Sequence, residues 1–376
     1  MFEEHINRLK EYISLLSLDI CCSDIFIEKV RNRLKYFNGF PRIEIILFNE
    51  NIHFLLSLRK MPILHNIIEI NNIEIITADY ALNNYHDLSG CSLISIEITC
   101  RTEILIKKGV KPKILISGES PIFAWEFFVN LNKHGALFES LMLPKGVVNF
   151  APKLASKIQQ TSFPIPKKIC SKIQNYDEWK TRARACVIIS NRVWRPRGFK
   201  HLQQILKTPV IAKSLYEKRN KAIITLSKTG LVELYGRGWG NYVLGGNVIN
   251  YYKLKRLWKG ELDIKDSGMG GYKFAICYEN TDFPGYVTEK IFDSLASGAI
   301  PIYYGSDYIK EILPRELYID VKEFNSIHDV GEYINKFSAD DYQVFYDTLI
   351  HFCRSKEFNL NTYEARAEKI FNTVNT

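Results

Sequence analysis

One strand–helix–strand segment constrains the fold more than any other part of the chain. Tyr272–Tyr278 is a run of apolar and aromatic residues that predicts a buried strand. A helix is predicted from Thr288, a good N-cap residue, with Glu289 in the first turn, where an acid suits the helix dipole. Gly298 would end that helix, and Ala299–Tyr304 is a second apolar strand. These elements form a βαβ unit, so we expect a parallel sheet.

The chain is long enough for two α/β domains. A single hydrophobic core stops growing near about 250 residues, and this chain has 376. Ala185–Ile189 and Leu231–Tyr235 predict further strands in the C-terminal half. The N-terminal half contains Ile-rich runs and, over residues 1–17, the pattern of an amphipathic helix. The Ile-rich strands are expected at Ile43–Phe48, Ile67–Ile70, Ile73–Ala78 and Ile114–Ile116, followed by a helix at Phe123–Leu131.

A proline-containing stretch sets the predicted domain boundaries. Residues 150–180 hold Pro152, Pro164 and Pro166 among polar residues, which favours an interdomain linker. Two α/β domains in tandem suggest a ligand-binding cleft between them. We therefore expect an N-terminal domain, a linker, a C-terminal domain and a helical tail, at residues 1–165, 166–180, 181–350 and 351–376.

Several functional classes are disfavoured by the sequence. The eight Cys form no C-x-x-C pair and the His form no H-x-x-x-H pair, so zinc and redox sites are not expected. The Cys are expected to be buried free thiols of a reducing compartment. The acidic start, Met1–Ile6, is unlike a signal peptide, and no run approaches the roughly 18 apolar residues of a membrane span. The formal charge of +9 suits an anionic partner or a solvated basic surface.

The loop Glu279–Val287 is a candidate binding site. It follows a strand and enters a helix, which places it at the sheet edge where ligands bind in doubly wound folds. The free N–H groups of a helix N-terminus suit a phosphate, and Lys290 adds a positive charge. Glu289 would accept hydrogen bonds from ribose or sugar hydroxyls. By itself, the same pattern also fits an ordinary loop with surface charges.

The residues around this loop carry a longer signature. Tyr-Lys-Phe begins at Tyr272, Glu-Asn ends the strand, Tyr-Val-Thr-Glu-Lys begins at Tyr286, and Ser-Gly-Ala-Ile-Pro-Ile begins at Ser297. Two upstream blocks, Ser190–Asn191 and Leu234–Arg237, complete the set. In this order the segments resemble the α-1,3-fucosyltransferases, glycosyltransferase family 10, over about residues 180–350.

The resemblance implies a fold, an activity and a donor site. The fold would be GT-B, with two Rossmann-like domains facing a central cleft. The reaction would be an inverting transfer of L-fucose from GDP-fucose without a required metal or other cofactor, and no D-x-D sequence stands between the strands of the second half. The donor would contact the C-terminal domain at Asn280, Tyr286, Glu289 and Lys290.

The resemblance also implies an arginine that binds the diphosphate. Counting from Ser190 favours Arg197 and leaves Arg195 as the second candidate. A guanidinium suits the role because its planar fork donates two parallel hydrogen bonds to phosphate oxygens. Trp194 and Pro196 depart from the family pattern in this segment.

Gly118–Pro121 is the clearest match in the N-terminal half, because the family has Glu-Ser-Pro at this place. The resemblance implies that Glu119 is the general base. An inverting transfer needs a carboxylate that takes the proton of the acceptor hydroxyl. The alternatives are that Glu-Ser-Pro simply starts a turn or helix, since proline favours early helical positions, and that the neighbouring Glu126 is the base.

The sequence thus predicts a cytoplasmic fucosyltransferase acting on an oligosaccharide or lipid-linked glycan. Its rivals are a GT-B transferase of another nucleotide sugar, a catalytically silent sugar-binding module and a nucleic-acid-binding protein, of which we expect the last least. Membrane contact is expected to be at most peripheral, at the inner membrane. The chain ends without the basic repeats that bacterial members often carry.

One basic cluster is left over. It fits anionic lipid or nucleic acid, although a solvated face is the favoured interpretation. The cluster consists of Lys253, Lys255, Arg256 and Lys259, beside Trp258.

Overall fold

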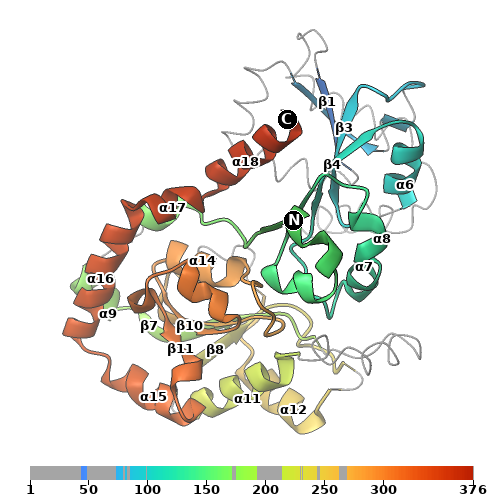
Figure 1. Cartoon of the computed structure of the whole chain (residues 1–376). Coiled ribbons are helices and arrows are strands. Elements are labelled where there is room, and N and C mark those ends of the chain that lie inside the picture. The colour runs from blue at the N-terminus through green and yellow to red at the C-terminus, as the bar shows by residue number, and fades with distance from the viewer. Residues whose placement is uncertain are drawn as a thin grey trace, which may run out of the picture. The chain divides into compact units, whose positions relative to one another are not determined.

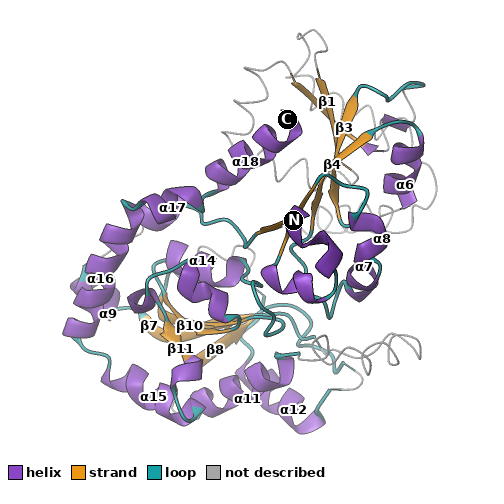
Figure 2. Ribbon diagram, in the orientation of Figure 1, coloured by secondary structure: helices purple, strands orange, loops and turns teal. Residues whose placement is uncertain are grey.

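The computed structural model describes residues 44–48, 73–78, 81–82, 85–98, 100–171, 175–192, 214–228, 230, 232–243, 246–261 and 269–375. These residues form two compact units: one reaches Leu115 and includes the chain end from Thr373, and the other is Ile116–Asn372. Figures 1 and 2 show their elements. The predicted helix at 1–17 and the predicted strand Ile67–Ile70 lie outside the described residues. The four predicted domain boundaries stay a prediction.

The first unit is built on parallel strands. β1 (Glu44–Phe48) pairs in parallel with β2 (Ile73–Thr77) and with β3 (Cys91–Ile96). The order is β2-β1-β3-β4, where β4 (Lys111–Ile116) follows helix α6 (Cys100–Lys107). Three of the predicted Ile-rich strands are therefore confirmed. β3 was not predicted, because two serines interrupt its apolar run although its first five residues are buried.

The second unit begins with short elements. The predicted helix Phe123–Leu131 is two helices, α7 (Trp125–Val129) and α8 (Leu131–Gly135). Asn130 lies between them, and its side-chain amide donates to the carbonyl of Glu126 at 2.9 Å, in competition with the helical backbone bond to the same oxygen. The strands β5 (Ser140–Leu143) and β6 (Ile158–Gln160) follow and pair in parallel.

The larger sheet of this unit is entirely parallel, as the βαβ segment predicted. Its order is β11-β10-β9-β7-β8, so the chain changes direction between β7 and β9, where ligands bind in such sheets. All the strands predicted for the C-terminal half are confirmed. They are β7 (Ala183–Ile188), β8 (Val232–Tyr235), β9 (Tyr272–Tyr278) and β10 (Ile300–Tyr304). The short β11 (Ile319–Asp320), which was not predicted as a strand, pairs in parallel with β10.

Helices cover both faces of this sheet (Figures 1 and 2). On one face, α11 (Tyr216–Ser227) contacts α12 (Val248–Leu257) and α15 (Ile327–Lys336). On the other, α14 (Glu289–Ala296) contacts β9, β10 and the 3₁₀ helix η4 (Lys167–Ser171). The other helices within the described ranges are α9 (Tyr176–Lys180), α16 (Ala339–Cys353), α17 (Lys356–Leu360), α18 (Tyr363–Asn375) and the 3₁₀ turns Lys145–Asn149, Pro152–Lys157, Asp307–Glu311, Arg315–Leu317 and Val321–Glu323.

The central helix α14 has the predicted ends. Thr288 is its N-cap residue, with an extended backbone, and Gly298 follows its end with a φ of +77°. The buried face of α14 includes Ile291, Phe292 and Leu295, which lie on β9 and β10. This packing fixes the direction of the helix N-terminus at the carboxyl edge of the sheet.

Cys170 and Cys353 form a disulfide between η4 and α16. The prediction that the cysteines are free thiols is therefore wrong for this pair. No sequence spacing indicates the bond, because it joins residues 183 positions apart that only tertiary packing brings together. Cys186 and Cys277 are buried thiols, as expected. Burial raises the pKa of Cys186 to about 12, so that thiol is unreactive.

Gly236, at the end of β8, provides a test of the fold. Its φ is +123°, and a Cβ there would lie 2.0 Å from the carbonyl oxygen of Ile189. Gly236→Ala is expected to lower the free energy of unfolding by about 3 kcal/mol, because backbone must move. Gly240→Ala is the matched control, since nothing lies within 4 Å of its Cβ position. Urea unfolding would measure both, and equal midpoints would contradict this account.

Candidate functional site

A buried carboxylate organises the loop between β9 and α14. Glu279 directly follows β9 and is 0% exposed. Its Oε1 accepts a hydrogen bond from the backbone N–H of Thr288 at 2.7 Å. Its Oε2 accepts from the hydroxyl of Thr288 at 2.7 Å and from Nζ of Lys290 at 3.2 Å. One side chain therefore fixes both the start of α14 and the direction of Lys290.

Lys290 is held as a cation at the N-terminus of α14. Its side chain is 21% exposed, and its Nζ also donates to Oγ1 of Thr288 at 2.9 Å. Burial lowers the pKa of Lys290, but the charges of Glu279 and Glu289 outweigh that effect and leave the pKa raised. The ammonium group therefore stays protonated at neutral pH.

Tyr286 and Asn280 meet inside the same loop. Tyr286 is buried, and its hydroxyl accepts a hydrogen bond from Nδ2 of Asn280 at 3.3 Å. Burial raises the pKa of Tyr286 well above its usual value, and the charges of Glu279, Glu119 and Glu289 raise it further. The phenol is therefore protonated, and the charge of the exposed Glu119 reaches it. The structure thus brings the predicted base and the predicted donor-binding loop together.

An aromatic contact links the segment after Glu119 to α11. The rings of Phe123 and Tyr216 lie 5.6 Å apart, and the guanidinium of Arg219 lies 4.8 Å from the Tyr216 ring centroid. The loop before α11 is tied to the β9–α14 loop, because the backbone N–H of Leu215 donates to the carbonyl of Asn280 at 3.0 Å. Segments far apart in sequence therefore converge on one edge of the sheet.

Arg219 is a buried cation that the sequence analysis missed. It is 3% exposed, its Nε has no hydrogen-bond partner, and no carboxylate among the described residues pairs with it. Burial lowers the pKa of Arg219 to about 10, which leaves it protonated. Its charge also acts to lower the pKa of Lys290, so the two cations lie near each other. Because a buried unpaired charge is costly, this arrangement favours an anionic ligand.

A sequence signal for Arg219 did exist. It lies in line with Ala222 and Leu226 on the buried face of α11, where an arginine is out of place. The predicted candidates, Arg195 and Arg197, lie outside the described residues, so their role stays a prediction. Glu279 also had a signal, as an acid directly after a fully apolar strand.

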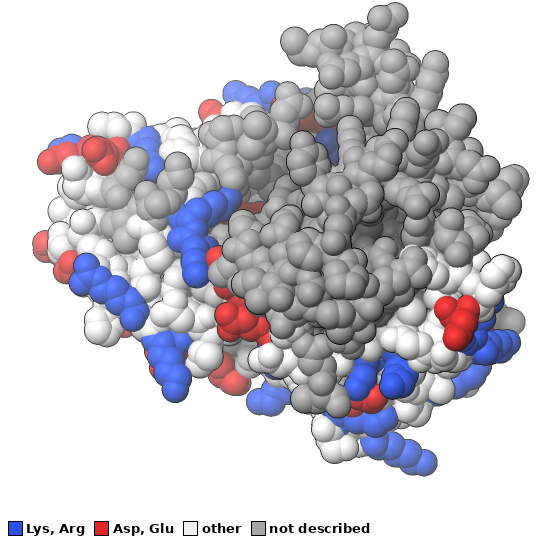
Figure 3. Space-filling model, turned by 90° about the horizontal axis from the view of Figure 1, so that it is seen from above, with Lys and Arg blue, Asp and Glu red and all other residues white. Residues whose placement is uncertain are grey.

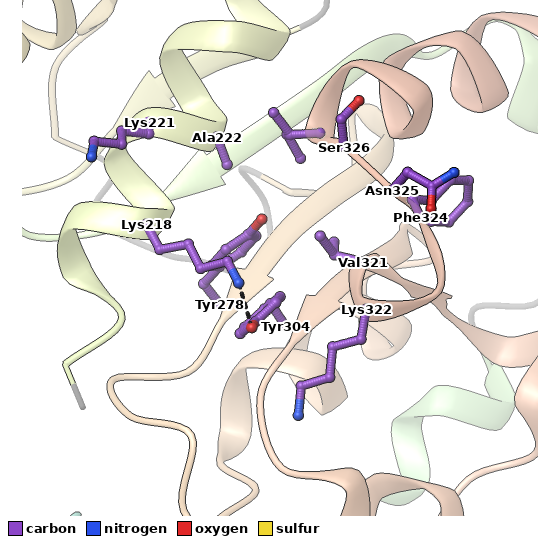
Figure 4. A pocket seen from close by; sticks show the side chains of 11 residues that line it. Lys218, Lys221, Ala222, Tyr278, Tyr304, Val321, Lys322, Phe324, Asn325 and Ser326 are labelled. Carbon is purple, nitrogen blue, oxygen red and sulfur yellow. Dashed lines mark hydrogen bonds between the residues drawn. The ribbon is translucent and has the colours of Figure 1, made fainter. Parts of the chain in front are cut away.

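A pocket of about 350 Å³ opens beside this site at the ends of β9, β10 and β11 (Figure 4). Tyr278 and Tyr304 stack in it with ring centroids 5.3 Å apart, and Lys218 donates to the hydroxyl of Tyr304. Lys322 forms ion pairs with Asp282 at 3.0 Å and with Asp307 at 3.4 Å. The pocket therefore joins aromatic rings to amino groups, a lining that suits a sugar or a planar anionic ring.

The two upstream blocks of the signature also meet. Nδ2 of Asn191 donates to the carbonyls of Gly238 and Asn241 at 3.0 Å each. The indole of Trp239 donates to the carbonyl of Ile189 at 3.0 Å. These groups are used within the protein, so residues 236–240 form a structural turn.

The described residues contain neither a cluster of metal ligands nor a helix that could span a membrane. No group of three or more His, Cys, Asp or Glu is placed there to hold a metal ion. No helix in that part of the chain has the length and apolar character needed to cross a bilayer. On the face drawn in Figure 3, the described Lys and Arg are spread among Asp and Glu rather than gathered in one patch.

The segment that carries the candidate site is similar to known fucosyltransferases. Residues 204–371 match the family model described as "Glycosyltransferase family 10 (fucosyltransferase) C-term". The chain is 38% identical over 72 residues to an alpha-(1,4)-fucosyltransferase of Arabidopsis thaliana, and 34% identical over 103 residues to the alpha-(1,3)-fucosyltransferase FucT of Helicobacter pylori. These alignments cover 19% and 27% of this chain but only 18% and 20% of the relatives, about a fifth of their length.

Solved structures show the fold. A crystal structure of alpha1,3-fucosyltransferase aligns with a TM-score of 0.50 at 17% identity, over 89% of this chain and 90% of that one. The same enzyme with GDP-fucose gives 0.50 at 16% identity, over 90% and 91%. The predicted GT-B fold is therefore confirmed, as is the resemblance to family 10.

Removing the charge of Glu279 tests the organisation of the loop. Glu279→Gln should lower the free energy of unfolding by about 3 kcal/mol, because it leaves the ammonium of Lys290 without its carboxylate. Urea unfolding measures the change. Glu332→Gln is the control, because Glu332 forms an exposed pair with Lys336 and should matter little.

The stability difference between wild type and Glu279→Gln is expected to depend on pH. The pKa of Lys290 is raised in the folded protein, so the contribution of its pair with Glu279 is complete below the ordinary lysine pKa. That contribution is lost as the pH rises through the raised pKa. The stability difference between wild type and Glu279→Gln should therefore shrink at that alkaline pH. A difference that does not change with pH would exclude the ion pair as its cause.

Proposed function

Because residues 204–371 match the C-terminal domain of glycosyltransferase family 10, we propose that this protein is a glycosyltransferase that moves L-fucose from GDP-fucose to a glycan hydroxyl. The observation that carries the proposal is the buried Arg219, which has no carboxylate partner among the described residues and lies near Lys290, beside a loop that the charge of Glu119 also reaches. Transfer from a nucleotide sugar needs both features, because the diphosphate needs a cationic site and the acceptor hydroxyl needs a nearby base.

The diphosphate would bind at the N-termini of α11 and α14. Lys290 lies in the first turn of α14, and Arg219 lies near the start of α11. Both helix ends add partial positive charge. The guanidinium of Arg219 would regain in the diphosphate the anionic partner that it lacks in the protein. Arg197 or Arg195 would add a further contact if the segment that carries them reaches the same phosphates.

The sugar would lie against the loop between β9 and α14. Asn280, Tyr286 and Glu289 all belong to that segment, and they offer an amide, a neutral phenol and a carboxylate for hydroxyl groups. Glu279 already uses both carboxylate oxygens, which accept hydrogen bonds from Thr288 and Lys290. We therefore assign Glu279 to positioning and the other three to contact with the donor.

The transfer step would be a direct displacement with inversion. The acceptor oxygen attacks the anomeric carbon of fucose while the bond from that carbon to the β-phosphate oxygen breaks, and GDP leaves with the electron pair. The carboxylate of Glu119 takes the proton of the acceptor hydroxyl. Lys290 and Arg219 stabilise the charge that develops on GDP, so the proposal requires no metal ion.

The acceptor and the location are part of the proposal. An oligosaccharide or lipid-linked glycan fits the expected chemistry, in the cytoplasm or at the inner membrane face. In that reducing compartment Cys170 and Cys353 would be kept as thiols. The rival donors are other nucleotide sugars, which competition between GDP and UDP for the same site would separate.

The proposed base is tested by Glu119→Gln. This variant should lose about 10²- to 10⁴-fold in the rate of fucose transfer, because the amide takes up no proton. Its affinity for GDP, measured by calorimetry, should stay close to that of wild type. Glu126→Gln is the matched control, since Glu126 is the other exposed glutamate near that segment. Transfer lost in Glu126→Gln but kept in Glu119→Gln would reverse the assignment.

The proposed diphosphate site is tested by titration with GDP. Lys290→Ala and Arg219→Gln should each weaken GDP binding by roughly 10- to 100-fold, which is the usual effect of losing a hydrogen bond to a charged group. Lys228→Ala removes an exposed lysine just beyond the other end of α11 and should leave the affinity unchanged. Binding of GDP that survives in both variants would place the nucleotide elsewhere, and no binding by wild type would refute the function itself.

A further inference from the structure

Helix α12 exposes apolar side chains in an unusual concentration. Val248, Ile249 and Tyr252 are 50%, 66% and 58% exposed, and Tyr242 just before the helix is 39% exposed. These are four of the ten large apolar side chains that the described residues expose, and they fall within eleven consecutive positions. Single exposed apolar residues are ordinary, but a contiguous group marks a surface with a partner.

The same helix carries a group of cations without an acid. Lys253, Lys255 and Arg256 lie one, three and four positions after Tyr252, and all three are exposed. No Asp or Glu occurs in Val248–Leu257. Exposed Lys259 extends the group past the end of the helix. The face is therefore both apolar and positively charged, which a merely solvated basic surface does not explain.

The orientation of α12 is fixed from within. Tyr251 and Leu254 are buried on its inner face, and the hydroxyl of Tyr251 lies 3.2 Å from the carbonyl oxygens of Trp239 and Gly240. The helix packs beside α11 on one face of the larger sheet (Figure 1). Its opposite side is presented outward without rearrangement, so binding there needs no folding step.

We propose that the outer face of α12 docks on an anionic lipid bilayer. Val248, Ile249 and Tyr252 would enter the interface between headgroups and acyl chains, while Lys253 and Arg256 would lie against anionic headgroups. Lys255 is engaged within the protein, because its Nζ donates to the carbonyl of Gly240 at 3.0 Å. Charge complementarity selects this surface over a neutral one. Nucleic acid would use the cations and the tyrosine, but it gives no role to the two exposed aliphatic side chains.

The docking does not depend on the proposed enzymatic function. A bilayer is bound by the outer face of α12, whereas the cations Lys290 and Arg219 lie at the ends of α14 and α11. Vesicle binding can therefore be measured without donor or acceptor. If the protein is also a transferase, docking would bring it to acceptors carried by lipid.

Co-sedimentation of the full chain with vesicles tests the proposal. Wild type should bind vesicles of phosphatidylcholine with phosphatidylglycerol and should bind phosphatidylcholine alone much less. The double variant Lys253→Gln with Arg256→Gln should lose about 30-fold in affinity, from the usual effect of two cations near an anionic surface. Ile249→Ser should lose about tenfold or more through the apolar side chain alone.

Matched controls separate docking from general charge and exposure. Lys133→Gln with Lys153→Gln removes the same charge from exposed lysines elsewhere, and Leu360→Ser removes an apolar side chain that is 63% exposed. Both controls should bind vesicles like wild type, and circular dichroism should show that every variant is folded.

Either of two results would overturn the proposal. The first is no binding of the wild-type protein to either vesicle, and the second is an equal loss of vesicle binding in the control variants. If vesicles are not bound, the same face would have another use. That use would appear as salt-sensitive binding to duplex DNA that the double variant loses, or as a concentration-dependent dimer that Ile249→Ser abolishes.

Discussion

The carboxylate of Glu279 is the interaction on which the candidate site depends. Placed at the end of a buried strand, it accepts hydrogen bonds from the backbone and hydroxyl of Thr288 and from the ammonium of Lys290. A helix N-terminus normally caps itself with the side chain of its first residue. Here Thr288 gives its hydroxyl to Glu279 instead, so the capping residue, the loop and the cation are locked to the sheet as one unit. A cation held in this way needs little reorganisation when it meets an anion.

The second constraint is a charge that the protein does not neutralise by itself. Arg219 is buried against the ring of Tyr216, with an unpartnered Nε and no carboxylate partner among the described residues. A buried charge without a partner lowers the stability of the fold, and such a cost is retained mainly where the charge serves binding. The same tyrosine contacts Phe123, four residues after Glu119. The costly cation and the candidate base therefore share one aromatic support, which couples their positions.

Parts of the site and fold were predictable because their signals are local. Apolar runs gave the strands of both halves, and the order of Tyr286, Glu289 and Lys290 after a strand identified the binding loop. Gly298 marked the end of α14 for the same reason, since a φ of +77° suits glycine. β3 was not predicted, because its two buried serines interrupt the apolar run that would have indicated a strand. The division of one expected helix into α7 and α8 depended on the side chain of Asn130, whose competition with the backbone no periodicity reveals.

By itself the sequence determined the parallel α/β architecture of the C-terminal half and the resemblance to family 10, because both are carried by residues close together in the chain. Tertiary structure alone decided which groups meet. It paired Cys170 with Cys353, placed Arg219 near the cation of Lys290, and left Ile249 and Tyr252 exposed on α12. Burial, pairing and exposure are properties of packed surfaces. They depend on what the rest of the chain places opposite each side chain, and a linear pattern does not contain that information.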